Sequence, residues 1–447
     1  MLKKLFQHLL ITLAAGFGHA CVSPSSPPDT AIAPGETYSA FSDDGSWCWF
    51  SDPRALYYEG EHSRTYAGWM DQSGNVMVGY YDHGTQEIHQ EVLHEKLEVD
   101  DHDNPSLMMD DDGKLLVFYS KHSTGEPIYL MKARQAENIS DWEPRQELYL
   151  NDTTAYAEFS NTYTYVNPYQ LSEEDNKLYL FWRGADFKPN VATSEDGGTN
   201  WSKGKILILP SRVYRNRRPY VKVSSNNRDQ IHLAFTDGHP RDEPTNSIYY
   251  MQYHDGALFK ADGEKIADFS AIPVSPEATD MVYDASTTGE KAWIWDVTEN
   301  EEGHPVLTYV RFPNDSTHVY YYALWDGNAW QNHKITEGGS WFPQTPAGEV
   351  EREPNYSGGV VLDHQDPSTV YLSRQVDGTF EIERWTTDNQ GKDWSSQAIT
   401  QNSAFDNIRP FVIRNYKQED DLRVLWMNVK HYRHYTDYHT ALKMNVK

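Results

Sequence analysis

Short runs of alternating apolar and polar residues, each following a polar turn, recur along the chain. The runs are rich in Val, Ile, Tyr, Phe and Trp, the composition of half-buried β-strands, and no helical periodicity is sustained between them. Seven such units begin at residues 74, 113, 176, 229, 304, 367 and 420. Seven units with a mean spacing of about 58 residues predict an all-β fold, a seven-bladed β-propeller.

Two further segments are typical of propeller hairpins. Residues 194–201, SEDGGTNW, resemble the Asp box S-x-D-x-G-x-T-W of sialidase-like propellers, and residues 386–394, TTDNQGKDW, are a looser copy. In such turns we expect the Asp to bind backbone amides and the Trp to pack beneath. These motifs are structural, and no three-arginine cluster accompanies them, so a sialidase is a weak interpretation.

The N-terminal residues have the layout of an export signal. Residues 1–20 combine a basic start, an apolar run and a small residue before Cys21, which predicts a signal peptide too short to span a membrane in the mature protein. Residues 21–38 form a Ser/Pro-rich tether, and residues 39–447 are expected to be one catalytic propeller. We therefore predict an exported protein without a transmembrane segment, either secreted or lipid-anchored through Cys21 at the bacterial cell surface. Cys21 and Cys48 are the two cysteines, which excludes a disulfide framework.

The charge balance restricts the partners. The formal net charge of −27 argues against nucleic acid, which would be repelled. Residues 211–223 differ from this background because they contain five basic residues and no acid: Arg212, Arg215, Arg217, Arg218 and Lys222. This basic island predicts an anionic ligand bound through arginine forks; the alternative is a solvated strand edge protected against aggregation.

Two predicted hairpins carry candidate chemistry at their open ends. Residues 101–123 fold about a turn near Asp112, which sets His102 opposite His122. Residues 162–184 turn at residues 173–177, and the same reasoning places Tyr165 and Asn167 across from Arg183. If the hairpins are neighbours, a histidine pair, a tyrosine and an arginine face one cleft.

This set of residues suits β-elimination from a uronic acid better than glycoside hydrolysis, which needs two carboxylates. Elimination removes the proton next to a carboxylate and protonates the departing oxygen, and Arg183 would neutralise the carboxylate. Tyr165, with a pKa lowered by Arg183, and His102 are assigned to the two proton transfers in either order. Tyr156, Tyr163 and Tyr169 are the alternatives to Tyr165.

Four segments carry a family resemblance: WCWFSDPRALYYEG, DDHDNPSLMMDDDGKLLVFYSKHS, TYVNPYQLSEEDNKLYLFWRG and RPYVKVSSNNRDQIHLAFTDGHPRDEPTNSIYY. Together they resemble the BNR-repeat ulvan lyases, seven-bladed propellers of polysaccharide lyase family 25, with family 24 next. The resemblance implies cleavage of ulvan between 3-sulfated rhamnose and glucuronic or iduronic acid, giving an unsaturated uronyl end. It implies His102, Tyr165 and Arg183 as catalytic residues. The implied substrate-binding residues are His122, Asn104, Arg218, Tyr220 and His239.

The resemblance also bears on partners and cofactors. It implies an anionic sulfated polysaccharide as partner, and propellers of this group can hold a structural calcium or zinc ion with unknown ligands. The elimination itself needs no cofactor if Arg183 supplies the positive charge. We expect a monomer. Two other functions stay open: a propeller lyase or glycosidase acting on rhamnose linked to glucuronate, and a non-catalytic surface protein that binds the glycan unchanged.

Overall fold

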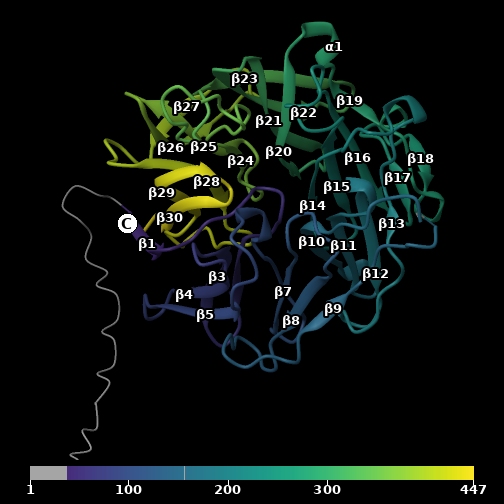
Figure 1. The fold of residues 1–447 in the computed structure, drawn as a ribbon, viewed down its shortest axis with the longest axis horizontal. Helices are drawn as coiled ribbons and strands as arrows, with labels where there is room; N and C mark the ends of the chain where they lie inside the picture. Colours follow the sequence, from purple (N-terminus) through teal and green to yellow (C-terminus); the bar gives the residue numbers. More distant parts are fainter. Residues whose placement is uncertain (1–37, 156, 447) are drawn as a thin grey trace, which may run out of the picture.

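The structure is a computed structural model that describes residues 38–155 and 157–446. Seven antiparallel sheets surround a common axis (Figure 1), so the predicted all-β, seven-bladed propeller is confirmed. The predicted signal peptide and, apart from Tyr38, the predicted tether lie outside the described residues. Within the described part, no helix has the length and apolar character that a membrane span requires.

The first three sheets each contain four strands in chain order, beginning at the axis. The first comprises β2 (Ala55–Glu59), β3 (Ser63–Met70), β4 (Val76–Asp82) and β5 (Ile88–His94). The second comprises β6 (Ser106–Met109), β7 (Leu115–Tyr119), β8 (Ile128–Lys132) and β9 (Gln146–Leu148). The third comprises β10 (Thr164–Leu171), β11 (Lys177–Arg183), β12 (Pro189–Ser194) and β13 (Lys205–Ile206).

The fourth sheet is larger and comprises β14 (Val221–Ser225), β15 (Ile231–Thr236), β16 (Ile248–His254), β17 (Ala257–Phe259), β18 (Lys265–Asp268) and β19 (Asp280–Tyr283). A one-turn helix, α1 (Ala285–Thr288), follows it. The fifth comprises β20 (Lys291–Glu299), β21 (Pro305–Asn314), β22 (Thr317–Trp325) and β23 (Trp330–Gly339). The sixth comprises β24 (Val360–Leu362), β25 (Thr369–Val376), β26 (Thr379–Thr386) and β27 (Ser395–Ala398).

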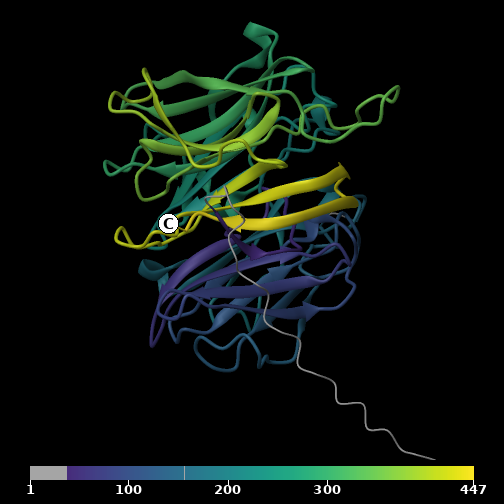
Figure 2. The same cartoon turned by 90° about the vertical axis from the view of Figure 1, so that its left-hand side faces the viewer.

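The seventh sheet joins the two ends of the chain. It contains β28 (Asp406–Val412), β29 (Val424–His434) and β30 (Asp437–Met444), and its outer strand is β1 (Ser39–Ser42). Ser39 of β1 pairs with Met444 of β30, and Figure 2 shows the C-terminal strands in yellow beside the first strands in purple. Hydrogen bonds between the chain ends therefore close the ring and leave fewer open sheet edges.

Each of the seven predicted turn-and-strand units falls in a different sheet. They correspond to β4, β7, β11, β15, β21, β25 and β29. Both Asp boxes form the turn between the third and fourth strands of a sheet, as expected for structural marks. Asp196 Oδ1 accepts a hydrogen bond from the Asn200 amide at 2.8 Å, and Asn389 Oδ1 takes the same role towards Asp393 at 2.9 Å.

A β-bulge in β10 changes the predicted register of the second hairpin. Thr164 pairs with Arg183, but Asn167 pairs with Phe181, so the prediction that Asn167 lies opposite Arg183 was wrong. The bulge centres on Tyr165, whose φ of 57° lies in the left-handed region. The extra residue turns Tyr165 towards the propeller axis.

Asn167 instead holds the bulge and the neighbouring segment together. Its Oδ1 accepts from the Asp52 amide at 2.9 Å, and its Nδ2 donates to the carbonyls of Phe50 and Tyr165 at 3.0 and 2.8 Å. All these atoms are remote from solvent, since Asn167 is 2% exposed. One side chain thus satisfies three buried backbone groups.

Replacing Asn167 with alanine should therefore destabilise the fold. The free energy of unfolding, measured by equilibrium urea denaturation, should fall by about 3 kcal/mol because buried backbone groups lose their partners. The matched control is Asn328→Ala in an exposed turn, which should change it by less than about 0.5 kcal/mol. Equal stabilities of the two variants would contradict this account.

Candidate functional site

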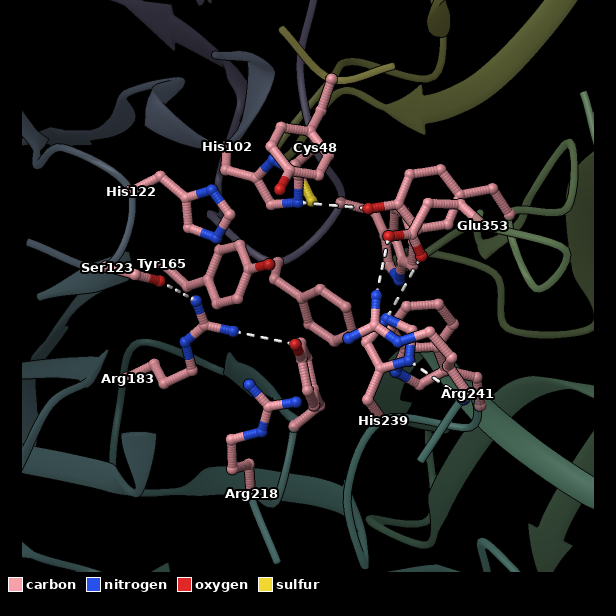
Figure 3. Close-up of a pocket in the computed structure, with 16 residues that line it drawn as sticks. Cys48, His102, His122, Ser123, Tyr165, Arg183, Arg218, His239, Arg241 and Glu353 are labelled. Carbon is pink, nitrogen blue, oxygen red and sulfur yellow. Dashed lines mark hydrogen bonds and ion pairs between the residues drawn. The ribbon is translucent and has the colours of Figure 1, made fainter. Parts of the chain in front are cut away.

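A cavity of about 330 Å³ opens at one end of the propeller axis. It lies where the innermost strands begin and the second strands end, because neighbouring antiparallel strands bring those two ends to the same edge. Figure 3 shows its side chains pointing inward from several sheets. Seven of the eight predicted site residues line it: His102, His122, Tyr165, Arg183, Arg218, Tyr220 and His239.

The two predicted histidines meet, as the hairpin reasoning required. The rings of His102 and His122 are stacked with centroids 4.2 Å apart and planes 6° from parallel. Asp100 is shared between them: its Oδ1 lies 2.7 Å from Nδ1 of His102, and its Oδ2 lies 2.9 Å from Nδ1 of His122. This carboxylate sets the orientation of both rings.

His102 has a second carboxylate partner. Asp101 Oδ1 lies 3.0 Å from His102 Nδ1. The other oxygen of Asp101 accepts hydrogen bonds at 2.6 Å from Arg409 Nη1 and from the Tyr432 hydroxyl. Arg409, on a bulge of β28, is fully buried, so the last sheet of the ring supports a histidine that belongs to the second.

The two histidines differ in charge at neutral pH. Burial opposes the cationic form of His102, but the neighbouring Cys48 and Asp100 outweigh it and raise the pKa of His102 well above its usual value. Burial, together with the neighbouring charge of His102, lowers the pKa of His122 to about 4. His122 is therefore a neutral imidazole. Its Nδ1 donates to Asp100, which leaves the Nε2 lone pair free to accept a proton.

Arg183 is a buried cation for which the described residues supply no counter-anion. Its Nη1 donates to the Tyr220 hydroxyl at 2.9 Å and its Nη2 to Ser123 Oγ at 2.6 Å, while the guanidinium lies 4.5 Å from the ring centroid of Tyr165. No carboxylate in the described part of the chain forms an ion pair with it, although it is only 6% exposed. A guanidinium in this state is suited to bind an anionic ligand.

Tyr165 directs its hydroxyl into the cavity (Figure 3), where no described residue forms a hydrogen bond with it. The predicted lowering of its pKa was wrong: burial raises the pKa of Tyr165 well above its usual value and outweighs the opposite effect of Arg183. Tyr165 is therefore a phenol that can donate a proton. The alternatives Tyr163 and Tyr169 bind backbone groups elsewhere and do not line the cavity, and Tyr156 lies outside the described residues.

The basic island is less isolated than the sequence suggests. Acids from other segments pair with its arginines: Arg218 lies 2.5 Å from Asp242, and Arg217 forms an ion pair with Asp237. Of the five basic residues of the island, Arg218 is the one that lines the cavity. The predicted anion-binding role therefore narrows to Arg218, whose side chain is 31% exposed.

Of the predicted substrate-binding residues Asn104 and His239, only His239 lines the cavity. Asn104 does not line the cavity; its Oδ1 accepts from the Cys48 amide at 2.9 Å and its Nδ2 lies 3.4 Å from the Ser51 carbonyl. The direct substrate contact predicted for Asn104 thus has no support from its position, and the residue holds the cavity-lining segment around Cys48 in place. His239 lines the cavity, and its Nδ1 accepts from the Arg241 amide at 3.1 Å.

Sequence reasoning missed several cavity residues from the C-terminal half. Trp293, Glu353, Tyr356 and Tyr435 line the cavity together with Arg241. Glu353 lies in the loop before β24 and carries no motif, so the sequence offers no signal for it. Cys48 is fully buried, as expected of a core residue, but it also lines the cavity.

Two groups of possible metal donors lie beside the cavity. The donor atoms of Asp100, His102 and His122 are close together, and so are those of Cys48, Asp101 and His102. The carboxylates already bind the imidazoles and Arg409, which accounts for their positions without an ion. We assign no metal there, and the structural calcium or zinc ion stays a prediction.

The fold and the cavity define a seven-bladed propeller with an aromatic, positively charged pocket at one end of its axis. The chain belongs to the BNR repeat-containing family, whose sequence profile matches residues 64–338. No curated protein sequence matches the chain.

Two solved structures share the fold over most of both chains. One is a polysaccharide lyase family 25 ulvan lyase bound to -[GlcA(1-4)Rha3S]-, and the other is a second structure of a family 25 ulvan lyase. Each has a TM-score of 0.68 and 14% identity, and the match covers 90% of this chain and 94% of the other. At that identity the likeness establishes the fold alone. The catalytic domain of a Coprinopsis cinerea α-L-arabinofuranosidase also matches, with a TM-score of 0.37, 10% identity and coverage of 76% and 88%.

Proposed function

We propose that this protein is an ulvan lyase, which cleaves the bond between 3-sulfated rhamnose and glucuronic or iduronic acid by β-elimination. The observation that carries the proposal is Arg183, a buried guanidinium without an acidic partner among the described residues. A uronate carboxylate is the planar anion that fits its fork. The similarity in fold to a family 25 ulvan lyase and the sequence resemblance point to the same substrate.

The charge states favour one order of proton transfers. With the carboxylate on Arg183, His122 Nε2 removes the proton from C5, and the electron pair moves into the carboxylate to give an enediolate that Arg183 stabilises. The bond from C4 to the glycosidic oxygen then breaks, C4 and C5 form a double bond, and Tyr165 donates its proton to the leaving oxygen. His102 serves as a fixed cation beside the base, which revises the sequence-based assignment of His102 to a proton transfer.

Hydrolysis is disfavoured by the arrangement of carboxylates. Of the described residues that line the cavity, Glu353 is the carboxylate, and its Oε1 accepts from Arg241 Nη1 at 3.0 Å. Asp100 and Asp101 do not line the cavity and instead contact the imidazole rings of His102 and His122. A glycosidase needs two carboxyl groups flanking the scissile bond, one as acid and one as base or nucleophile.

Arg218 and Arg241, with side chains 31% and 44% exposed at the cavity rim, share Asp242 as an acidic partner and have further N–H groups to donate to the sulfate ester of the neighbouring sugar. We propose that the protein is exported, either secreted or lipid-anchored, and that it acts as a monomer.

The direct test is ultraviolet absorbance of native and desulfated ulvan incubated with the purified protein, because elimination leaves a conjugated double bond. A rise on native ulvan alone would establish a sulfate-dependent lyase, and a rise on both polymers would retain the lyase but remove the role of sulfate. No rise on either polymer, with binding still measurable, would replace the lyase by a glycan-binding protein.

Arg183→Asn should retain the fold and lower kcat/KM on ulvan by about 10²–10³-fold, because the developing negative charge loses its stabilising partner. Initial rates of absorbance increase measure this loss. Arg228→Asn is the matched control, since Arg228 is exposed in the turn between β14 and β15 at the opposite end of the sheet. Substantial residual activity of Arg183→Asn would remove Arg183 from its role.

The pH profile should identify the base. His122 works only when unprotonated and its pKa is about 4, so kcat/KM should fall about tenfold per pH unit below that value and be level from about pH 5 to neutrality. A decline of kcat/KM with a midpoint near pH 6.5, the ordinary pKa of histidine, would contradict the assignment of His122 as the base. The profile of the Tyr165→Phe variant, which lacks the proton donor, should show a much lower rate at every pH.

A further inference from the structure

The wall opposite the two stacked histidines contains polar groups that the elimination does not use. Glu353 has a side chain only 8% exposed, and its Oε1 is held by Arg241. Its Oε2 is buried and has no hydrogen-bond partner among the described residues. A buried acceptor without a donor is costly in a folded protein, which indicates that a ligand supplies the donor.

His239 faces this acceptor in a defined tautomer. Burial, with a contribution from Arg241, lowers the pKa of His239 well below its usual value, so the ring is neutral. Because Nδ1 accepts from the Arg241 amide, Nε2 carries the proton. Nε2 lies 3.7 Å from Glu353 Oε2, which is longer than a hydrogen bond. A donor and an acceptor therefore face each other across a gap.

A hydroxyl group in the cavity can bridge these two atoms from the side: an oxygen about 2.8 Å from each forms the apex of a triangle whose base is their 3.7 Å separation. Its oxygen can accept from His239 and donate its own proton to Glu353, whereas a sulfate or carboxylate would bring an anion against the Glu353 carboxylate. The Trp293 ring, which also lines the cavity, lies 4.4 Å from the His239 ring and offers an apolar surface beside the polar pair. An aromatic surface with a few placed polar groups is the usual composition of a small-ligand site.

We propose that Glu353, His239 and Trp293 form a subsite for a free, unsulfated hydroxyl group of the sugar that neighbours the uronate bound at Arg183. The subsite deepens the proposed function and rests on it for the identity of the polymer. Glu353 and His239 are then specificity residues that recognise a free hydroxyl group.

The test separates this subsite from the lyase chemistry by measuring binding of two small probes. Methyl α-L-rhamnopyranoside is neutral and hydroxyl-rich, and methyl β-D-glucuronide carries the carboxylate expected at Arg183. Tryptophan fluorescence and calorimetry give the dissociation constants. The variants are Glu353→Gln and His239→Phe, and Glu349→Gln is the control, with the same substitution at an exposed position of the same loop.

Wild type should bind the rhamnoside saturably in the millimolar range, Glu353→Gln and His239→Phe should each weaken it about tenfold, and Glu349→Gln should not change it. The double variant should bind no more weakly than either single variant, because both residues contact one hydroxyl group. Glucuronide binding should persist in Glu353→Gln, which also reports that the cavity is folded.

Kinetics on the polymer give a second readout. Glu353→Gln should raise KM about tenfold and change kcat less than about twofold, since the hydroxyl contact is made equally in the ground and transition states. Wild type without saturable rhamnoside binding, or variants that bind it as wild type does, would overturn the subsite. If the wild-type protein binds the rhamnoside but has no lyase activity on ulvan, the proposed reaction is contradicted and the subsite is retained.

Discussion

The sharing of one carboxylate by two imidazoles determines the charge pattern of the cavity. Asp100 can neutralise one imidazolium, and the rings of His102 and His122 lie only 4.2 Å apart, so a second positive charge there would be repelled. His102 takes the charge because Asp101 also contacts it, and His122 is left neutral with a free nitrogen. A cation and a base thus arise side by side from two residues of the same type.

Two buried arginines illustrate how the structure separates support from function. Arg409 is paired with Asp101 and holds it beside His102, so its charge is compensated within the fold. Among the described residues, Arg183 donates hydrogen bonds to hydroxyl groups and packs against aromatic rings, and it has no acidic partner there. The chain has a net charge of −27, so acidic side chains that could pair with Arg183 are abundant. A buried guanidinium without one costs stability that a bound anion would restore.

Local patterns in the sequence predicted the fold and seven of the sixteen residues that line the cavity. The meeting of His102 and His122 follows from a symmetrical hairpin, which needs only turn position and strand alternation. The register of Asn167 failed because a bulge adds one residue, and the pKa of Tyr165 failed because burial depends on the packing of other sheets. Glu353 lies about 250 residues from the histidines and reaches them only through the closed ring, which short-range patterns do not encode.

The closed ring also divides the cavity by origin. The second and third sheets supply the histidines, Tyr165 and Arg183, while Trp293 and Glu353 come from the fifth and sixth. The catalytic wall is held by buried ion pairs and a bulge, which leave little freedom to change. The opposite wall is built partly from the loop before β24. Among the described residues, the part of this loop that carries Glu353 belongs to no strand. Changes in that loop can therefore alter which sugar is recognised while the geometry of proton transfer stays fixed, which is a physical reason for placing recognition and chemistry on different sheets.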